Sequence, residues 1–266
     1  MAQARHASGG GVGRAQGGQA DGRLVLVTRP EPDAETTAAL LRERGFLALV
    51  APMLRIVALP ARLPPPERVQ AVLAASLNAI RTLPEPHRAL PLLAVGDATA
   101  AEARRVGVSD VRSAAGDASA LAALASRTLD PKAGPLLLPT RPDEGFRLAA
   151  DLRRNGFRVL RRITYDAQPA VSLPPESAAA LREGRVRTVL FFSASAARVF
   201  ARVVRACGLE ARLSGVEALA ISAAAASGLT GLAFRRIRSA ARPDQDSLLA
   251  LLCASCSSEG MKGDRG

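Results

Sequence analysis

The 266-residue sequence has few of the side chains that many enzymes use for catalysis and metal binding. It contains no tryptophan, one tyrosine, two histidines and three cysteines, and aromatic residues make up 3% of the chain. The histidines, His6 in an N-terminal tail and His87 in a proline-rich loop, exclude a histidine-based catalytic triad and a histidine-ligated metal. So few aromatic residues leave little surface for stacking on bases or sugars. The single tyrosine, Tyr165, is therefore a candidate functional residue.

The cysteines, Cys207, Cys253 and Cys256, give no disulfide framework, which favours a reducing, cytosolic environment. The CxxC spacing of the last two has neither a second pair nor a histidine near it, so we expect no zinc site and no redox chemistry. Residues 1–22 contain no apolar run that could serve as a secretory signal or membrane span. They are predicted to form a disordered tail, and residues 253–266 are predicted to form a second tail.

Arginine supplies nearly all of an excess of positive charge. The sequence has 36 lysine and arginine residues against 24 acidic ones, for a formal net charge of +12. Such a charge attracts anions, and nucleic acid is one candidate. However, the basic residues are scattered in pairs, without a basic stripe interleaved with aromatic residues, and a small polyanion fits equally well. Solvent-exposed arginine without a binding role is the alternative explanation.

Two stretches of the sequence occur twice. LVLVTRP at 24–30 returns as LLLPTRP at 136–142, and each copy is followed by a helical pattern that ends in Gly-Phe. A second unit, AVLAASLNAIRTL, returns as TVLFFSASAARVF, with Ser76 and Ser193 at matching positions. The repeat is the size of one whole domain and is too long for the repeating unit of a solenoid.

Apolar strands alternate with helical patterns throughout both repeats. This alternation predicts parallel sheets covered by helices on both faces. The predicted fold class is α/β, with two flavodoxin-like parallel-sheet domains. Two segments between the repeated units, PMLRIVALPARLPPP and RRITYDAQPAVSLPP, are prone to form strands and end in prolines. We expect them to form a two-stranded linker that joins the domains.

Five stretches, taken in order, resemble the uroporphyrinogen-III synthase family: VLVTRPEPDAETTAALLRERGF, AVGDATAAEARRVG, ITYDAQP, VLFFSASAARVF and ALAISAAAASGL. The resemblance covers nearly everything outside the two tails. It implies a discontinuous first domain, an inserted second domain and two linker strands, with the ligand bound between the domains. The implied boundaries are 24–54 plus 170–252 for domain 1, 66–161 for domain 2, and 55–65 and 162–169 for the linker strands.

The resemblance implies the family's activity, the cyclisation of hydroxymethylbilane to uroporphyrinogen III in haem biosynthesis. The implied substrate is a linear tetrapyrrole with eight carboxylates, which loses water while ring D is inverted through a spirocyclic intermediate. The protein must supply a folded substrate pose and a proton for the leaving hydroxyl. We expect no cofactor, no nucleic-acid partner and no membrane partner, and we expect a cytoplasmic monomer.

Candidate substrate-binding residues lie where predicted strands meet helices, because the carboxyl ends of parallel strands bind ligands and helix N-termini bind anions. These residues are Thr28, Arg29, Ser76, Asn78, Gly96, Thr99, Ser193, Ser195, Ser222 and Ala223. For each hydroxyl, capping of the helix is the structural alternative. Arg29 is a candidate carboxylate clamp, with packing over the turn as its alternative.

The catalytic candidate is Tyr165. It matches the linker tyrosine that the family places beside the tetrapyrrole, where the resemblance implies that it assists departure of the hydroxyl. A phenol with a pKa of about 10 is protonated at neutral pH and can donate its proton. Without the resemblance, a lone tyrosine on a strand is usually a packing residue.

Two stretches depart from the family's pattern. Relatives often have Phe-Thr-Ser where this chain has Ala74-Ala75-Ser76, and Gly-Pro-x-Thr-Ala where it has Ser222 followed by four alanines. A non-catalytic binder of tetrapyrrole or other polycarboxylate anions, built on the same fold, is therefore an alternative function. A nucleotide-binding regulatory module is a second alternative, although no glycine-rich phosphate loop follows a predicted strand.

Overall fold

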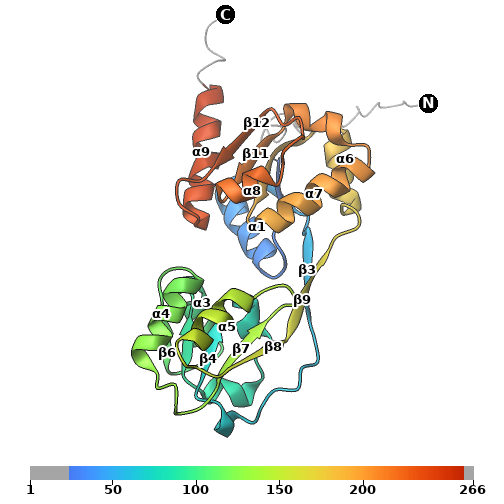
Figure 1. Cartoon of the computed structure of the whole chain (residues 1–266). Coiled ribbons are helices and arrows are strands. Elements are labelled where there is room, and N and C mark those ends of the chain that lie inside the picture. The colour runs from blue at the N-terminus through green and yellow to red at the C-terminus, as the bar shows by residue number, and fades with distance from the viewer. Residues whose placement is uncertain (1–23, 261–266) are drawn as a thin grey trace, which may run out of the picture. The chain divides into compact units, whose positions relative to one another are not determined.

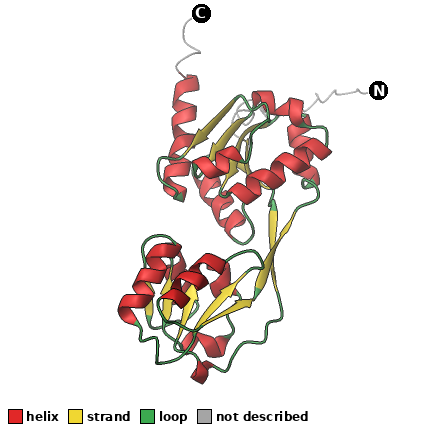
Figure 2. Ribbon diagram, viewed as in Figure 1, coloured by secondary structure: helices red, strands yellow, loops and turns green. Residues whose placement is uncertain are grey.

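The structure is a computed structural model that describes residues 24–260, with side chains described from 24 to 252. It contains two five-stranded parallel sheets with helices packed against them and a separate antiparallel pair of strands (Figures 1 and 2). The predicted α/β fold class is confirmed. The predicted tail at 1–22 lies outside the described residues, as do the side chains of Cys253 and Cys256.

The described residues divide into two compact units, the first made of residues 24–53 and 170–260 and the second of residues 54–169. The sheet of the first unit has the strand order β12-β11-β10-β1-β2, so it combines strands from both ends of the chain. Its strands are β1 (Leu24–Val27), β2 (Leu47–Val50), β10 (Val186–Phe191), β11 (Glu217–Ala220) and β12 (Arg236–Ser239). Its helices are α1 (Asp33–Glu43), α6 (Pro175–Arg182), α7 (Ala194–Ala206), α8 (Ala223–Ser227) and α9 (Gln245–Gly260), with a 3-10 helix, η3 (Glu210–Gly215).

The sheet of the second unit has the strand order β6-β5-β4-β7-β8. Its strands are β4 (Ala71–Ala74), β5 (Leu92–Ala94), β6 (Val111–Ser113), β7 (Leu136–Thr140) and β8 (Val159–Ile163). Its helices are α2 (Leu77–Arg81), α3 (Asp97–Arg105), α4 (Ala118–Thr128) and α5 (Phe146–Arg154), with the 3-10 helices η1 (Pro66–Arg68) and η2 (Glu85–Ala89). In both units every neighbouring pair of strands in the sheet is parallel.

Each sheet is buried on both faces, which explains the continuous apolar runs in its central strands. In the first unit, α6, α7 and α8 pack on one face and α1 and α9 on the other. In the second unit, α4 and α5 cover one face and α2 and α3 cover the opposite face. All residues of β1, β4 and β7 are buried, since neither face of these strands meets solvent.

The repeated Gly-Phe pairs have the same structural role in both copies. Gly45 and Gly156 have φ values of 78° and 87°, in the left-handed region that favours glycine. Each glycine follows a helix, α1 or α5, and lets the chain turn toward the next strand. The following residues, Phe46 and Phe157, are buried against the core. The repeat in the sequence is therefore a repeated β-α-β unit.

The antiparallel pair consists of β3 (Leu54–Ala58) and β9 (Tyr165–Pro169), with Leu54 opposite Pro169 and Ala58 opposite Tyr165. Both strands are shorter than the linker segments expected from the sequence. Residues 159–163 belong to β8, because they pair with β7 in the sheet. After Ala58 the chain is rich in proline, which lacks the amide hydrogen that a ladder needs.

The C-terminal helix is longer than expected. The tail predicted to begin at residue 253 starts inside α9, which continues to Gly260. Within the part of the chain that the structure describes, no helix is long and apolar enough to cross a membrane.

Candidate functional site

Three serines occupy equivalent positions, each directly before a helix that follows a buried parallel strand. The hydroxyl oxygens of Ser76, Ser193 and Ser222 accept hydrogen bonds from the amides three residues later, at 3.3, 3.1 and 3.3 Å. All three have extended backbone and form the N-caps of α2, α7 and α8. A cap satisfies only part of the first turn of a helix, so the remaining amides can bind an anion.

Gly96 caps α3 in the same extended conformation, with φ −155° and ψ 173°. A Cβ atom built on Gly96 would meet only the carbonyl oxygen of Gly116, at 4.0 Å, so there is room beside the backbone at this position. Thr99, in the first turn of α3, is buried. The open backbone of Gly96 therefore suits a ligand better than the Thr99 side chain does.

In the second unit, the hydroxyl oxygens of Ser76 and Tyr165 lie 2.8 Å apart. Tyr165 is 3% exposed. Burial raises the pKa of its phenol above the usual value, the hydrogen bond with Ser76 opposes this, and the nearby charges of Glu144 and Arg141 respectively raise and lower it. The phenol is therefore protonated at neutral pH and can act as a donor.

A second pair of hydroxyls lies beside the first. The Oγ1 atoms of Thr82 and Thr164 are 3.0 Å apart, and the Thr82 hydroxyl also donates to the carbonyl of Asn78 at 2.9 Å. Because Thr164 and Tyr165 are consecutive, the two pairs connect both ends of α2 to the point where β8 gives way to β9. Thr82 and Thr164 were missed by the sequence analysis, since neither residue carries a motif.

In the first unit, Thr28 and Arg29 follow β1 and are both engaged within their own unit. The Thr28 hydroxyl is buried and donates to the carbonyl of Leu190 at 2.6 Å. The Arg29 guanidinium lies over the ring of Phe192, 4.5 Å from its centroid. Thr28 therefore stabilises the junction between β1 and β10, and a ligand could reach its hydroxyl only if this bond broke.

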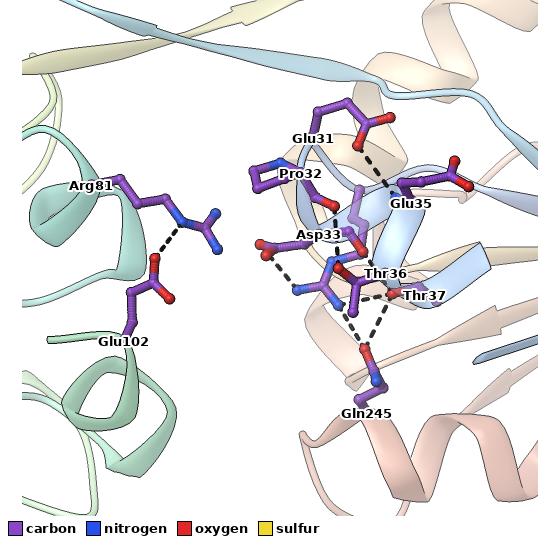
Figure 3. A network of polar contacts seen from close by, with 10 residues as sticks. Glu31, Pro32, Asp33, Glu35, Thr36, Thr37, Arg81, Glu102 and Gln245 are labelled. Carbon is purple, nitrogen blue, oxygen red and sulfur yellow. Dashed lines mark hydrogen bonds and ion pairs between the residues drawn. The ribbon is translucent and has the colours of Figure 1, made fainter. Parts of the chain in front are cut away.

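Figure 3 shows polar contacts around the start of α1, with Asp33, Thr37 and Gln245 labelled, and the Arg29 guanidinium contacts all three of these residues. Arg29 donates to Gln245 at 2.7 Å and to Thr37 at 3.2 Å, and it forms an ion pair with Asp33 at 3.3 Å. Gln245, which the sequence analysis did not select, also accepts from Thr37 at 3.2 Å. These contacts tie β1, α1 and α9 together, in agreement with the structural alternative for Arg29.

Two further candidates lie at the starts of helices in the first unit. Ser195 is in the first turn of α7, where its hydroxyl oxygen accepts from Arg198 at 3.3 Å. Ala223 is the first residue of α8 and is exposed, so only its backbone amide could contact a ligand. Ala225, in the stretch that departs from the pattern of the resembled family, is fully buried in the core, so its methyl group packs inward.

A buried ion-pair network was also missed by the sequence analysis. Glu102 of α3, 8% exposed, accepts from Arg81 at 2.9 Å, as Figure 3 shows. It also accepts from Arg105 at 2.8 Å. The hydrogen bond from Arg105 is the largest effect on the Glu102 pKa and lowers it. Burial raises this pKa and the hydrogen bond from Arg81 lowers it, so that the pKa falls from 4.5 to about 2. Glu102 is therefore ionised throughout the neutral range and fixes Arg81 at the end of α2. Among the residues with described side chains, no group of three or more His, Cys, Asp or Glu residues could hold a metal ion.

Comparison with solved structures shows the same fold in two bacterial proteins. A mutant uroporphyrinogen III synthase from Thermus thermophilus is 21% identical, with a TM-score of 0.50; the match covers 89% of this chain and 99% of that one. The uroporphyrinogen-III synthetase from Helicobacter pylori is 16% identical, with a TM-score of 0.61; the match covers 87% of this chain and 99% of that one. Comparison with curated protein sequences gave no match.

A sequence model of one family, described as uroporphyrinogen-III synthase HemD, matches residues 35–250, which include most of both units. The match spans more than half of the chain and therefore establishes the family independently of the fold. The chain belongs to the uroporphyrinogen-III synthase family.

Proposed function

We propose that this protein is a uroporphyrinogen-III synthase, which cyclises hydroxymethylbilane to uroporphyrinogen III with inversion of ring D and loss of water. Membership of the family supports this proposal. We further propose that it acts as a cytoplasmic monomer without a cofactor. The intrinsic reactivity belongs to the substrate, so the protein has to fold the chain of four pyrroles and protonate the leaving hydroxyl.

Tyr165 is the proposed proton donor. The Ser76 oxygen already accepts from the amide of Ala79, so the Ser76 proton can be donated to the phenol oxygen of Tyr165. The phenol proton then points away from Ser76 and can be given to the hydroxyl of the substrate. Its carbon–oxygen bond breaks, water leaves, and an azafulvene cation remains. Ring closure later releases a proton from the terminal pyrrole carbon, which restores the phenol.

The substituted carbon of ring D attacks the cation and forms the spirocyclic intermediate, which fragments and recloses with that ring inverted. No protein nucleophile is needed for these steps, which is consistent with the low histidine and cysteine content of the chain. The protein must instead keep the two reacting ends of the substrate close together. Correct positioning alone can account for several orders of magnitude in rate.

Helix N-termini are the proposed sites for the substrate carboxylates. In the second unit these sites are the N-terminus of α2, with Ser76 and Asn78, and that of α3, with Gly96 and Thr99. In the first unit they are the N-terminus of α7, with Ser193 and Ser195, and that of α8, with Ser222 and Ala223. A hydrogen bond to a charged partner contributes about 1.5–3 kcal/mol. Thr28 is proposed to support this set by fixing the junction between β1 and β10, and Arg29 by fixing the start of α1.

The observation that carries the proposal is the hydrogen-bonded pair of Ser76 and Tyr165, at the carboxyl end of a parallel strand in a chain of this family. The test is to supply hydroxymethylbilane and to separate the products, because the spontaneous reaction gives the type I isomer. The two departures from the family's pattern keep a non-catalytic tetrapyrrole binder as the alternative. Such a binder would retain affinity for tetrapyrrole and give no type III product.

A further inference from the structure

Phe146 is unusual in this chain because it is an aromatic side chain placed in solvent. It is the first residue of α5 and is 62% exposed. The guanidinium carbon of Arg161, on the edge strand β8, lies 3.9 Å from the centroid of its ring. An arginine stacked on an exposed ring forms a flat surface that is both apolar and positively charged.

The loop that presents Phe146 is held in place by the same arginine. Arg161 donates from Nε to the carbonyl of Glu144 at 2.7 Å, and from Nη2 to the carbonyls of Arg141, at 3.0 Å, and Pro142. Gly145, with φ 81°, allows the backbone to turn directly before Phe146. A side chain at Gly145 would also approach Leu138 at 3.2 Å, so the turn suits glycine for two reasons.

This surface belongs to the same unit as the proposed proton donor, and Arg161 precedes Tyr165 by four residues. Arg161 and Ile163 share one side of β8, because side chains alternate along a strand, and Ile163 is 39% exposed. Tyr165 follows Ile163 by two residues, which is at most about 7 Å along an extended chain. The charges of Glu144 and Arg141, from the loop before Phe146, also act on the Tyr165 phenol.

We propose that Phe146 and Arg161 form a subsite that binds one pyrrole ring of the linear tetrapyrrole together with a carboxylate on that ring. The pyrrole packs against Phe146. The carboxylate accepts from Nη1 of Arg161, which has no partner among the described residues. This inference rests on the proposed function for the identity of the ligand. The geometry suits the substrate because each of its rings is flat and carries two carboxylates.

The test is the steady-state kinetics of Phe146→Ala with hydroxymethylbilane. We expect KM to rise roughly three- to tenfold, as expected for the loss of one ring-stacking contact, with kcat changed less than twofold. Phe146→Tyr keeps the ring and should retain the wild-type KM. The matched control is Leu47→Ala, which removes an exposed apolar side chain from the amino end of β2 and should leave both constants unchanged.

Arg161 is tested by Arg161→Lys, which keeps the charge but loses the planar stack and the fork of hydrogen bonds. We expect KM to rise at least as much as in Phe146→Ala. The unfolding temperature of each variant shows whether it is folded. If Phe146→Ala is folded and has the wild-type KM, the subsite is wrong, whatever the result for Arg161→Lys.

A direct titration separates the subsite from the proposed function. Reduced uroporphyrinogen III is titrated into the wild-type protein and Phe146→Ala in a calorimeter under anaerobic conditions. If the wild type makes type III product but both proteins bind it equally, the subsite fails and the proposed function stands. If the wild type makes no type III product, the proposed function fails. Weaker binding of uroporphyrinogen III by Phe146→Ala than by the wild type would then still support the subsite. Equal binding by the two proteins, or no binding by either, would overturn it.

Discussion

The hydroxyl oxygens of Ser76 and Tyr165 lie 2.8 Å apart, although the residues are 89 positions apart in the sequence. Ser76 ends the loop after β4 and caps α2, and Tyr165 is the first residue of β9. One hydrogen bond therefore joins a helix N-terminus, where an anion can bind, to a buried phenol that remains protonated.

Tyr165→Phe should lower kcat about 100-fold, because the variant keeps the ring but has no proton for the leaving hydroxyl. The loss of one neutral hydrogen bond should reduce the free energy of unfolding by only about 1 kcal/mol. The rate of type III formation and a urea unfolding curve measure the two effects. Unchanged turnover in a folded variant would remove Tyr165 from the mechanism.

Ser76→Ala should lower kcat and shift the alkaline limb of the pH–rate profile to higher pH. The hydrogen bond with Ser76 lowers the pKa of the Tyr165 phenol and is the larger of the two effects that oppose burial, so its removal raises this pKa further. The variant also loses a helix cap, at about 1 kcal/mol. The control is Asp117→Ala, which removes the N-cap of α4. The Asp117 carboxylate accepts from two backbone amides, so this variant loses a helix cap without changing the surroundings of Tyr165. An alkaline limb that does not move would mean that Ser76 acts only as a cap.

Glu102→Gln should destabilise the protein by roughly 3 kcal/mol at neutral pH, since it replaces a buried carboxylate that two arginines stabilise. The folded-state pKa is lowered from 4.5 to about 2, so this stabilisation is present above pH 4.5 and is lost as the pH falls toward 2. Urea unfolding at neutral and acid pH measures this effect. The difference in the free energy of unfolding between the wild type and Glu102→Gln should become smaller as the pH is lowered. Glu67→Gln, at an exposed position in the same unit, should have little effect at either pH.

Arg29→Lys should destabilise the protein by about 1–2 kcal/mol, because lysine loses the stack on Phe192 and the bonds to Gln245 and Thr37. Thermal unfolding measures this change, with Arg44→Lys at an exposed position near the end of α1 as the control. A raised KM without any loss of stability would instead make Arg29 a carboxylate clamp.

The layout of strands and helices could be predicted because it depends on local patterns. Buried parallel strands are apolar along their whole length, and the turns after α1 and α5 need glycine, so Gly45 and Gly156 mark both repeats. The serines that cap α2 and α7 could be identified for the same reason, since a cap acts on amides only three residues away.

The contacts between distant side chains could not be predicted in this way. Arg29 and Gln245 are 216 positions apart, and no periodic pattern links them. The Glu102 network and the Thr82–Thr164 pair likewise depend on which helix ends the fold brings together. The expected linker segments 55–65 and 162–169 are not coextensive with the paired strands β3 and β9, because strand-forming composition alone does not specify the pairing partner.

The most direct test of the account is the isomer assay with the full chain. Purified protein is incubated with hydroxymethylbilane, and the oxidised products are separated into type I and type III uroporphyrin beside a protein-free reaction. We expect that type III dominates with the wild-type protein and that its rate of formation falls about 100-fold with Tyr165→Phe. A wild-type reaction that yields only the type I isomer, at the spontaneous rate, would contradict it.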